Sequence, residues 1–530
     1  MELDFETEYP SVRQPVIARN VVATSQPLAA QAGLRMLLRG GNAVDAALAA
    51  AITLTVVEPT SNGLGSDAFA ILWDGTGLHG LNGSGRSPAG WTPERFAGMR
   101  TMPQRGWDSV TVPGAVSAWV SLSERFGKLP FTELFEPAIA YAREGYPVSP
   151  VIAKGWRRAA DVLGREPGFA EAFMPGGRAP SAGETFRSPA MAETLEKIAE
   201  SCGEAFYRGA LACQIVDFSE RGGGAMTLDD LATHQADWCG TVSIDWYGYQ
   251  IHEIPPNGQG IAALIALGIL REIGGVESLS PDSAESIHLQ LEATKLAFAD
   301  LHEYVSDVEF MNVPPSALLD PAYLRGRAAL VDRGSAGRPR FGKLPHGGTV
   351  YLTAADANGM MVSFIQSNYM GFGSGIVVPG TGISMQNRGC GFRSEPGHVN
   401  SVGPRKRPFH TIIPGFVTRD GQPVMSFGVM GGPMQCQGHV QMAVRVLAHG
   451  QNPQAASDAP RWQVLEDGRV AVEAAMPASV IEALRGLGHD VEVRPGWANQ
   501  SFGGAQLIVR TQDGYMAGSD QRKDGQVAGF

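Results

Sequence analysis

The sequence predicts a mixed α/β (α+β) globular protein whose two parts meet at a segment rich in helix breakers. Helical patterns recur over the first part of the chain, around 28–57, 114–126, 132–144, 189–215, 260–273 and 281–306. The segment DRGSAGRPRFGKLPHGG at 332–348 contains too much Gly and Pro for a helix or a central strand, and is the best candidate linker. After it, short β-like runs separated by Gly, Asn and Pro replace the helical patterns.

The first helical region is expected to be two helices within 28–57. Gly40-Gly41-Asn42 interrupts the pattern, and Asn42 is a candidate N-cap for the apolar helix that follows. Glu58-Pro59 should end that helix. The next stretch, SNGLGSDAFAILWD, has a Gly-rich turn followed by an apolar run, which indicates a buried strand.

The composition and net charge of the chain exclude several classes of function. The 530 residues are 44% hydrophobic and 18% charged, so the chain can bury a large core without disulfides. The formal net charge of -11 argues against a nucleic-acid or anionic-membrane partner. Five cysteines without a C-x-x-C pair indicate reduced thiols. The opening MELDFETEYPSVRQ lacks the apolar stretch of a signal peptide, and no apolar run reaches membrane-spanning length. We therefore expect a cytoplasmic protein.

Several familiar sites are absent from the sequence. It contains no G-x-S-x-G nucleophile elbow and no P-loop, and its eleven histidines show no H-E-x-x-H or comparable ligand spacing. Neither a cofactor nor a metal is expected. The basic cluster Arg405-Lys406-Arg407 lies among Gly and Pro and is predicted to be a solvated loop.

Thr349 stands out because it follows Gly347-Gly348 and opens the predicted strand TVYLTAA. The turn Asp356-Ala357-Asn358-Gly359 follows, and MMVSFIQS returns as a second strand. A three-residue hairpin loop ending in Gly359 pairs Asp356 with Met360, so paired residue numbers sum to 716. That register sets Ser367 opposite Thr349. One face of the hairpin is then apolar (Val350, Leu352, Ala354, Val362, Phe364), and the other carries hydroxyls (Thr349, Thr353, Ser363, Ser367).

A hydroxyl at the start of a strand becomes a nucleophile if the chain is cut just before it. The freed α-amine, with a pKa of about 7.7 to 8.0, can accept the hydroxyl proton itself. Adjacent glycines allow the contorted backbone that such self-cleavage needs. From the pattern alone, an ordinary Thr in a β-hairpin after a flexible loop is the alternative interpretation.

Several blocks in the same order resemble the γ-glutamyltransferase (glutathione hydrolase) family of N-terminal nucleophile hydrolases. They are GGNAVDAALAAAITLTVVEPTSNGLGSDAF at 40–69, Thr111-Val112-Pro113-Gly114, PAIAYAREGYPVS at 137–149, Gly348-Thr349 with its hairpin, and Gly428-Val429-Met430-Gly431-Gly432-Pro433. The similarity covers nearly the whole chain, and it favours the nucleophile interpretation of Thr349.

This resemblance implies a four-layer αββα sandwich made as a single precursor. Cleavage of the Gly348-Thr349 bond would give a large subunit, 1–348, and a small subunit, 349–530, which build one αββα unit as an αβ heterodimer or a dimer of such heterodimers. Thr349 would form an acyl-enzyme, and the N–H groups of Gly431 and Gly432 would hold the oxyanion. Ser367 stands where the family has a threonine that hydrogen-bonds the nucleophile.

The substrate pocket departs from the family pattern. Arg86 in NGSGRSPAG is the counterpart expected to bind a substrate carboxylate, with a spacing to Pro two residues shorter than usual. The carboxylate that holds the glutamyl ammonium in the family aligns with Gly391. Four further positions expected at the substrate also differ from the family: Tyr369, Arg388, His410 and Thr411.

These departures resemble a subgroup that includes oxamate amidohydrolase and glutathione hydrolase-like proteins. They imply an amidohydrolase acting on a small carboxylate-bearing amide, with hydrolysis dominating transfer. Two alternatives stay open: a γ-glutamyltransferase or glutathione hydrolase proper, and an uncleaved, non-catalytic binding relative.

Overall fold

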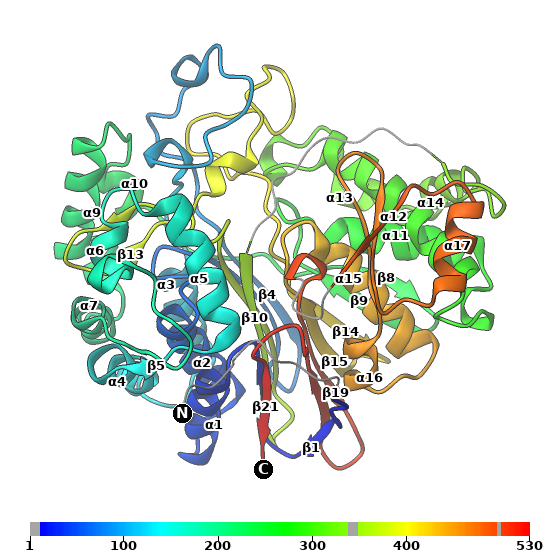
Figure 1. Ribbon diagram of the computed structural model, residues 1–530, viewed down its shortest axis with the longest axis horizontal. Helices are drawn as coiled ribbons and strands as arrows, with labels where there is room; N and C mark the ends of the chain where they lie inside the picture. The colour runs from blue at the N-terminus through cyan, green and yellow to red at the C-terminus, as the bar shows by residue number, and fades with distance from the viewer. Residues whose placement is uncertain (1–10, 338–347, 496–499) are drawn as a thin grey trace.

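Two antiparallel sheets packed face to face form the centre of the molecule, with helices over both outer faces (Figure 1). The structure is a computed structural model, and it describes residues 11–337, 348–495 and 500–530. The four layers confirm the αββα fold class.

Within the described residues, each central sheet has seven strands, in the following spatial order. The first contains β21 (Gln526–Gly529), β2 (Val21–Thr24), β10 (Gly348–Ala355), β11 (Met361–Tyr369), β3 (Asp67–Trp73), β4 (Leu78–Gly83) and β7 (Asp237–Trp238). The second contains β1 (Val16–Ala18), β20 (Tyr515–Ser519), β19 (Ala505–Arg510), β15 (Gln422–Val429), β14 (Gly415–Arg419), β9 (Tyr249–Glu253) and β8 (Val242–Trp246). Each sheet contains strands from both sides of residue 349, so the two segments share both sheets.

In the part of the chain that the structure describes, three smaller sheets lie outside the sandwich. They are β16 (Trp462–Val464) with β17 (Val470–Glu473) and β18 (Val491–Arg494), β12 (Val377–Val378) with β13 (Ile383–Ser384), and β5 (Tyr146–Pro147) with β6 (Thr185–Phe186).

The helices divide by position in the chain. On the side of the first sheet are α1 (Pro27–Leu38), α2 (Ala43–Val57), α3 (Ala115–Phe126), α4 (Glu136–Glu144), α5 (Pro150–Leu163), α6 (Phe169–Phe173), α7 (Pro189–Glu200), α8 (Glu204–Tyr207), α9 (Ala210–Arg221) and α10 (Leu228–Ala232). On the side of the second sheet are α11 (Gly260–Ile273), α12 (Ala284–Tyr304), α13 (Pro315–Leu318), α14 (Pro321–Ala328), α15 (Met434–Ala443), α16 (Pro453–Asp458) and α17 (Ala478–Gly486).

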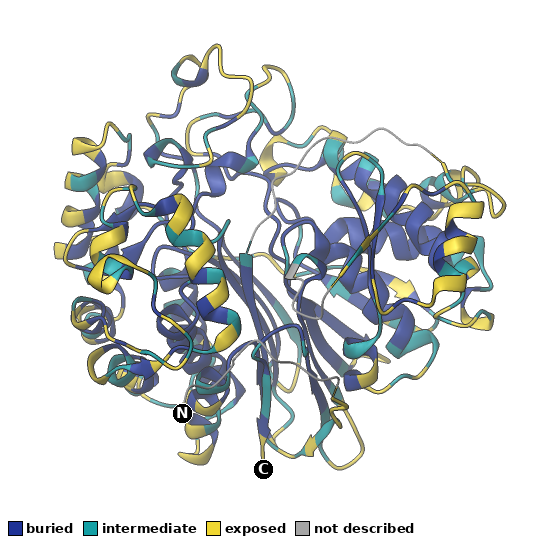
Figure 2. Ribbon diagram, in the orientation of Figure 1, coloured by how far each residue is buried: buried dark blue, intermediate teal, exposed yellow. Residues whose placement is uncertain are grey.

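Three apolar cores hold the layers together. One fills the space between the first sheet and its helices, a second lies between the second sheet and α11, α12 and α15, and a third lies between the two sheets. The central strands and the inner helices are almost entirely buried, whereas the edge strands β1 and β8 and the outer helices have exposed residues (Figure 2). The predicted apolar face of the β10–β11 hairpin belongs to the first of these cores.

The two helices predicted within 28–57 are present as α1 and α2, and the predicted N-cap begins α2. Asn42 accepts from the N–H groups of Val44 and Asp45, and the Asp45 carboxylate accepts from the Asn42 N–H, which completes a capping box. The α2 helix then runs to Val57, directly before Glu58. The predicted helix over 260–273 is also confirmed, whereas the pattern over 189–215 is divided into α7, α8 and α9.

The predicted hairpin register is confirmed over most of its length. From Val350 opposite Gln366 to Ala355 opposite Met361, paired numbers sum to 716. Gly359 closes the turn with a φ of 94°, a left-handed conformation that favours glycine. The hydroxyl face is not open to solvent, because it packs on the second sheet, where Thr353 Oγ1 lies 2.6 Å from Ser426 Oγ. Of the four predicted hydroxyl residues, Thr349 and Ser367 lie at the strand ends.

The basic cluster at 405–407 corrects the sequence prediction of a solvated loop. Lys406 and Arg407 are buried. Lys406 Nζ donates to the carbonyls of Val399 and Ser401, and Arg407 donates to the Ser84 carbonyl and pairs with Asp237 at 2.7 Å. The sequence pattern could not indicate this burial, because Ser84 and Asp237, the partners of Arg407, lie far from it in the sequence. Of the predicted linker, 332–337 contains no helix or strand, and 338–347 lies outside the described residues.

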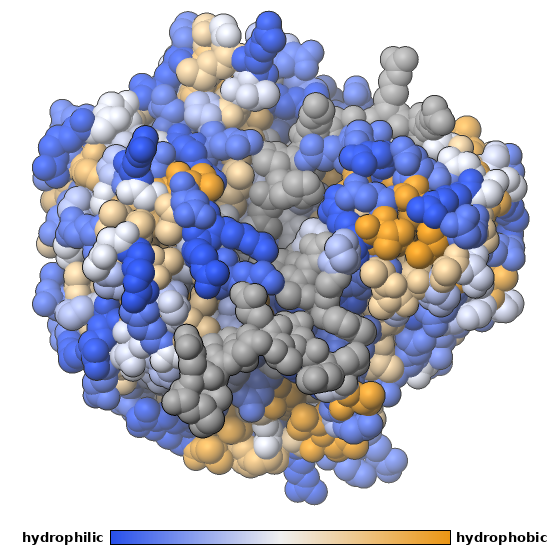
Figure 3. All heavy atoms as spheres, viewed as in Figure 1, coloured by the Kyte–Doolittle hydropathy of each residue, from blue (hydrophilic) through white to orange (hydrophobic). Residues whose placement is uncertain are grey.

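Exposed hydrophobic side chains do not form one continuous patch on the face in Figure 3. Large exposed hydrophobic side chains, such as Val12, Leu38 and Val162, are scattered, and hydrophobic residues form separate groups among hydrophilic ones on the face in Figure 3. Within the described part of the chain, no helix has the length and apolar character needed to cross a bilayer. All five cysteines are free, as predicted.

Candidate active site

Thr349 lies at the start of β10, and its side chain is buried at the end of the first sheet. Its Oγ1 donates to Ser367 Oγ at 3.3 Å. The structure therefore brings together the two hydroxyls that the hairpin register predicted.

A β-bulge shapes this strand end. Gly348 pairs with Tyr369 and Val350 pairs with Gln366, so Ser367 and Asn368 together oppose Thr349. Bulges commonly re-aim side chains beside active sites. Tyr369, at the end of β11, has a φ of 75°, and its N–H donates to Ser367 Oγ at 2.7 Å.

Ser367 also binds the bond predicted to be cut. Its hydroxyl donates to the Gly348 carbonyl oxygen at 2.7 Å. A donor on this oxygen polarises the carbonyl of the Gly348–Thr349 peptide bond.

Gly431 and Gly432 form a left-handed turn between β15 and α15. Their φ values are 117° and 60°, which glycine adopts without strain. Their carbonyls accept from the first N–H groups of α15, and the Gly432 carbonyl also accepts from Gln259 Nε2 at 2.8 Å. Among the described residues, neither the Gly431 nor the Gly432 N–H has an acceptor. Two free N–H groups in a glycine turn suit an oxyanion.

Gln435 is a site residue that the sequence analysis missed. It lies in the first turn of α15, and its Nε2 donates to Thr349 Oγ1 at 3.2 Å. The Ile413 N–H donates to Gln435 Oε1 at 3.0 Å, which fixes the amide orientation. The sequence did offer one indication of this role, since Gln435 lies two residues after the Gly431-Gly432-Pro433 segment that was predicted to hold the oxyanion.

Arg388 points inward, and it lies with Tyr369 and Thr411. Its Nη1 donates to Thr411 Oγ1 at 2.8 Å, and its guanidinium carbon lies 4.4 Å from the centre of the Tyr369 ring. Burial lowers the pKa of Arg388 to about 10. Burial raises the pKa of the Tyr369 hydroxyl.

His410 lies against Asp67, a second residue that the sequence analysis missed. His410 Nε2 lies 3.1 Å from Asp67 Oδ2, and Asp67 Oδ1 accepts from the N–H groups of Gly85 and Gly114. Burial raises the pKa of Asp67 to about 7, and burial with the nearby Arg388 keeps the pKa of His410 well below its usual range. Asp67 faces Ser367 across the β3–β11 pair, so it connects the strand end to both loops.

Arg86 lies apart from these residues. Its Nη1 pairs with Asp307 at 3.1 Å, its Nη2 lies 3.7 Å from Glu309, and the side chain is one-third exposed. It lines a cavity of about 380 Å³ whose other lining residues include Asp230, His234 and Arg407, but neither Thr349 nor Ser367.

Gly391 has no room for a side chain. A Cβ there would lie 2.5 Å from the carbonyl oxygen of Phe409. The position therefore cannot carry a carboxylate unless the backbone moves.

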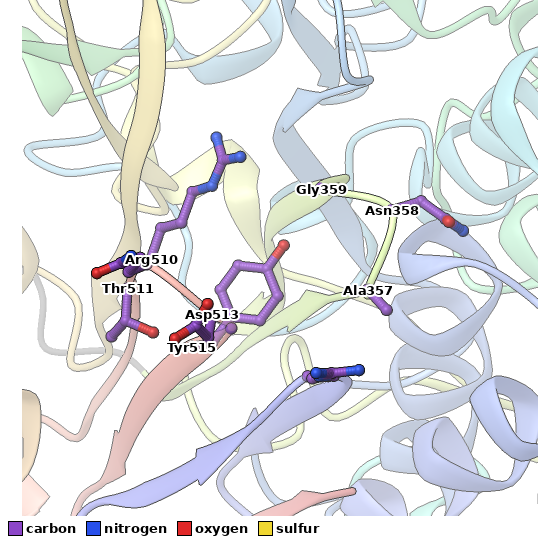
Figure 4. Close-up of a pocket in the computed structure, with 10 residues that line it drawn as sticks. Ala357, Asn358, Gly359, Arg510, Thr511, Asp513 and Tyr515 are labelled. Carbon is purple, nitrogen blue, oxygen red and sulfur yellow. The ribbon is translucent and has the colours of Figure 1, made fainter.

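A second cavity, of about 330 Å³, lies at the opposite end of β10. The β10–β11 turn at Ala357–Gly359 and the β19–β20 turn around Thr511–Gly514 line it, together with Arg19 (Figure 4). It is not part of the Thr349 site.

The fold also gathers His288, Glu292 and His489, whose ligand-type atoms lie within 4.8 Å of one another. The sequence spacing did not indicate this cluster. His288 Nδ1 and His489 Nε2 lie 2.8 Å apart, and the Lys295 ammonium donates to Glu292 at 2.8 Å. That ammonium supplies the positive charge that a metal ion would bring.

Comparisons with known proteins agree with this geometry. A family model described as Gamma-glutamyltranspeptidase matches residues 29–530. The glutathione hydrolase-like YwrD proenzyme of Bacillus subtilis is 36% identical, over 97% of this chain and 98% of its own. The oxamate amidohydrolase proenzyme of Klebsiella pneumoniae is also 36% identical, over 95% and 97%. The crystal structure of cephalosporin acylase from Bacillus halodurans has a TM-score of 0.95 and 49% identity, and the match covers 100% of this chain and 99% of that one.

Two of these relatives are named as hydrolase or amidohydrolase proenzymes and the third as an acylase, and all three match nearly the whole chain. They confirm the predicted enzyme class, an N-terminal nucleophile amidohydrolase. The chain belongs to the gamma-glutamyltranspeptidase family.

Proposed function

We propose that this chain is a self-processing threonine amidohydrolase that cleaves the amide bond of a small carboxylate-bearing substrate. The observation that carries the proposal is one chain of hydrogen bonds. Gln435 Nε2 donates to Thr349 Oγ1, Thr349 Oγ1 donates to Ser367 Oγ, and Ser367 Oγ donates to the Gly348 carbonyl. Nucleophile and scissile carbonyl share one hydroxyl partner.

In self-processing, Thr349 Oγ1 attacks the Gly348 carbonyl carbon while Ser367 polarises its oxygen. The C–N bond breaks, the Thr349 nitrogen receives the hydroxyl proton, and an ester links Gly348 to Thr349 Oγ1. Water then hydrolyses the ester. The products are 1–348 with a C-terminal carboxylate and 349–530 with a free Thr349 α-amine, which remain together as the two subunits.

In turnover, the α-amine accepts the proton of Thr349 Oγ1 as this oxygen attacks the substrate amide. The oxyanion lies against the N–H groups of Gly431 and Gly432, and each such donor contributes about 3 to 4 kcal/mol in hydrolases of this general type. The leaving amine takes the proton from the α-ammonium. Water then attacks the ester with the α-amine as base, which releases the acid and restores Thr349.

A γ-glutamyl substrate is disfavoured because its ammonium needs an anion. The family position for that anion is Gly391, where a Cβ would lie 2.5 Å from a backbone oxygen. The nearby cation Arg388 would repel an ammonium. A carboxylate-bearing amide without an ammonium fits this charge pattern better, and one relative is named as an oxamate amidohydrolase.

The test is intact-mass and N-terminal analysis of purified protein. Wild type should yield a fragment beginning TVYLTAADANG, Thr349→Ala should remain uncut, and Thr349→Ser should still process because it keeps the hydroxyl. The cleaved protein should hydrolyse oxamate in preference to glutathione. An intact chain after long incubation would favour the non-catalytic alternative, and preferred glutathione hydrolysis would favour the γ-glutamyl alternative.

A further inference from the structure

We propose that Arg388, rather than Arg86, binds the substrate carboxylate, and that the substrate is a monoamide of a short dicarboxylic acid. This assignment rests on the proposed role of Thr349 and names the substrate class of the same site.

Two guanidinium nitrogens of Arg388 have no hydrogen-bond partner among the described residues. Its side chain is 1% exposed, and its Nη1 donates to Thr411 Oγ1. Within the described residues, Nε and Nη2 are buried without any hydrogen-bond partner. These two nitrogens lie on the same edge of the guanidinium, the edge that forms two parallel bonds to a carboxylate.

The charge of Arg388 is also unneutralised by contact. No carboxylate in the described part of the chain lies within 4 Å of its guanidinium. Asp67 acts on it from farther away, and both Asp67 oxygens are already engaged by Gly85, Gly114 and His410. A buried cation with two free donors is costly unless an anion joins it.

The position of Arg388 relates this edge to the nucleophile. Its ring partner Tyr369 donates its N–H to Ser367, which binds Thr349. Its hydroxyl partner Thr411 shares the Gln259 amide with the Gly432 carbonyl. One residue, Tyr369, therefore links Arg388 to the hydroxyl relay, and two residues, Thr411 and Gln259, link it to the glycine turn.

Arg86 differs in each respect. Asp307 and Glu309 already neutralise its guanidinium, the Arg405 carbonyl accepts from Nη1, and its cavity does not include Thr349. A substrate carboxylate would have to displace two carboxylates there.

A dicarboxylic monoamide matches the two ends of the site. Its carboxylate accepts from Nε and Nη2 of Arg388 while its amide carbonyl lies at Thr349 and the glycine turn. Because the carboxylate is on the acyl side, the same contact holds the substrate and the later ester. Arg388 and neutral His410 offer nothing to an ammonium.

The experiment compares oxalyl, succinyl and glutaryl p-nitroanilides with neutral butyryl p-nitroanilide. The variants are Arg388→Met and Arg388→Lys, with Arg86→Met as the matched control. Losing two charge-assisted bonds predicts that Arg388→Met lowers kcat/KM for the best acidic anilide about 100-fold, mainly through KM. The butyryl anilide and every Arg86→Met rate should change less than about 3-fold. A selective loss in Arg86→Met, or an equal loss on acidic and neutral anilides in Arg388→Met, would overturn the assignment.

Self-cleavage reports whether each variant folds. If Arg388→Met stays uncut, a binding experiment replaces the anilide assay. Calorimetry then measures how tightly glutarate and butyrate bind to wild type and to Arg388→Lys. Wild type should bind glutarate more tightly, and Arg388→Lys should reduce this preference. Equal binding of both acids by wild type would refute the anchor. If cleaved wild type hydrolyses none of the anilides, the proposed function fails while the glutarate measurement still tests Arg388.

Discussion

The Ser367 hydroxyl lies 2.7 Å from the Gly348 carbonyl oxygen and 3.3 Å from Thr349 Oγ1, so one serine contacts both partners of the proposed self-cleavage. The bulge at the start of β10 brings these three residues together. This relationship leads to the first prediction.

Ser367→Ala should slow self-cleavage about 100-fold, because the scissile carbonyl loses its donor. The measurement is the uncut fraction against time by intact mass. Ser367→Thr is the matched control and should process faster than Ser367→Ala, since it keeps a hydroxyl. Cleavage of Ser367→Ala at the wild-type rate would mean that the bond to Gly348 does not assist the reaction.

Gln435→Met should lower kcat about 10-fold with little change in KM, because it removes one hydrogen bond to the nucleophile oxygen. The chain offers a matched control in the same helix. Gln437 is equally buried, but its amide binds the backbone of Pro433 and Val464 rather than Thr349. Gln437→Met should lower the melting temperature and leave kcat near that of wild type. Equal kcat losses in both variants would identify a packing effect.

The activity of the cleaved enzyme should rise with pH through one group with a pKa of about 7 to 8, the Thr349 α-amine. His410 cannot be this group, because burial and Arg388 hold the pKa of His410 well below its usual range. Burial raises the pKa of Asp67 to about 7, so the pH profile alone does not distinguish Asp67 from the Thr349 α-amine. Amine ionisation is strongly enthalpic and carboxyl ionisation is not, so the inflection of kcat/KM should move to lower pH on warming. An inflection that stays fixed with temperature would indicate Asp67.

Stability should depend on His252, which lies between Thr241 and Thr418 in the second sheet. Burial lowers the pKa of His252 from 6.5 to about 4. Because the pKa of His252 is lower in the folded than in the unfolded protein, the unfolded state binds the proton first as the pH falls. The free energy of unfolding is therefore at its full value above about pH 6.5 and decreases as the pH falls toward 4. From pH 7 to pH 5 the free energy of unfolding should fall about 2 kcal/mol more in the His252 protein than in His252→Gln.

Urea unfolding in the uncut Thr349→Ala background measures this difference on a single chain. Between pH 7 and pH 8 the two proteins should show nearly the same change, because His252 is mostly neutral in both the folded and the unfolded state. Parallel curves from pH 7 to pH 5 would mean that His252 titrates normally in the folded protein.

Local signals in the sequence determined the elements on which the site is built. Asn42 and Asp45 cap α2 through neighbours only three residues apart, and Gly359 sets the register that brings Ser367 to Thr349. Such features depend on backbone geometry over a few residues, which is why the sequence alone predicts them. The resemblance of several ordered blocks supplied the layer arrangement and the family.

The tertiary structure decided which side chains surround the nucleophile. Gln435 reaches Thr349 across 86 positions, and Asp67 reaches His410 across 343. Arg86 and Arg388 both lie beside a glycine, yet Arg86 pairs with Asp307, whereas Arg388 is buried and forms no ion pair with a carboxylate among the described residues. Burial and ion pairing depend on segments that meet only after the two sheets pack together, so no local pattern of the chain encodes them.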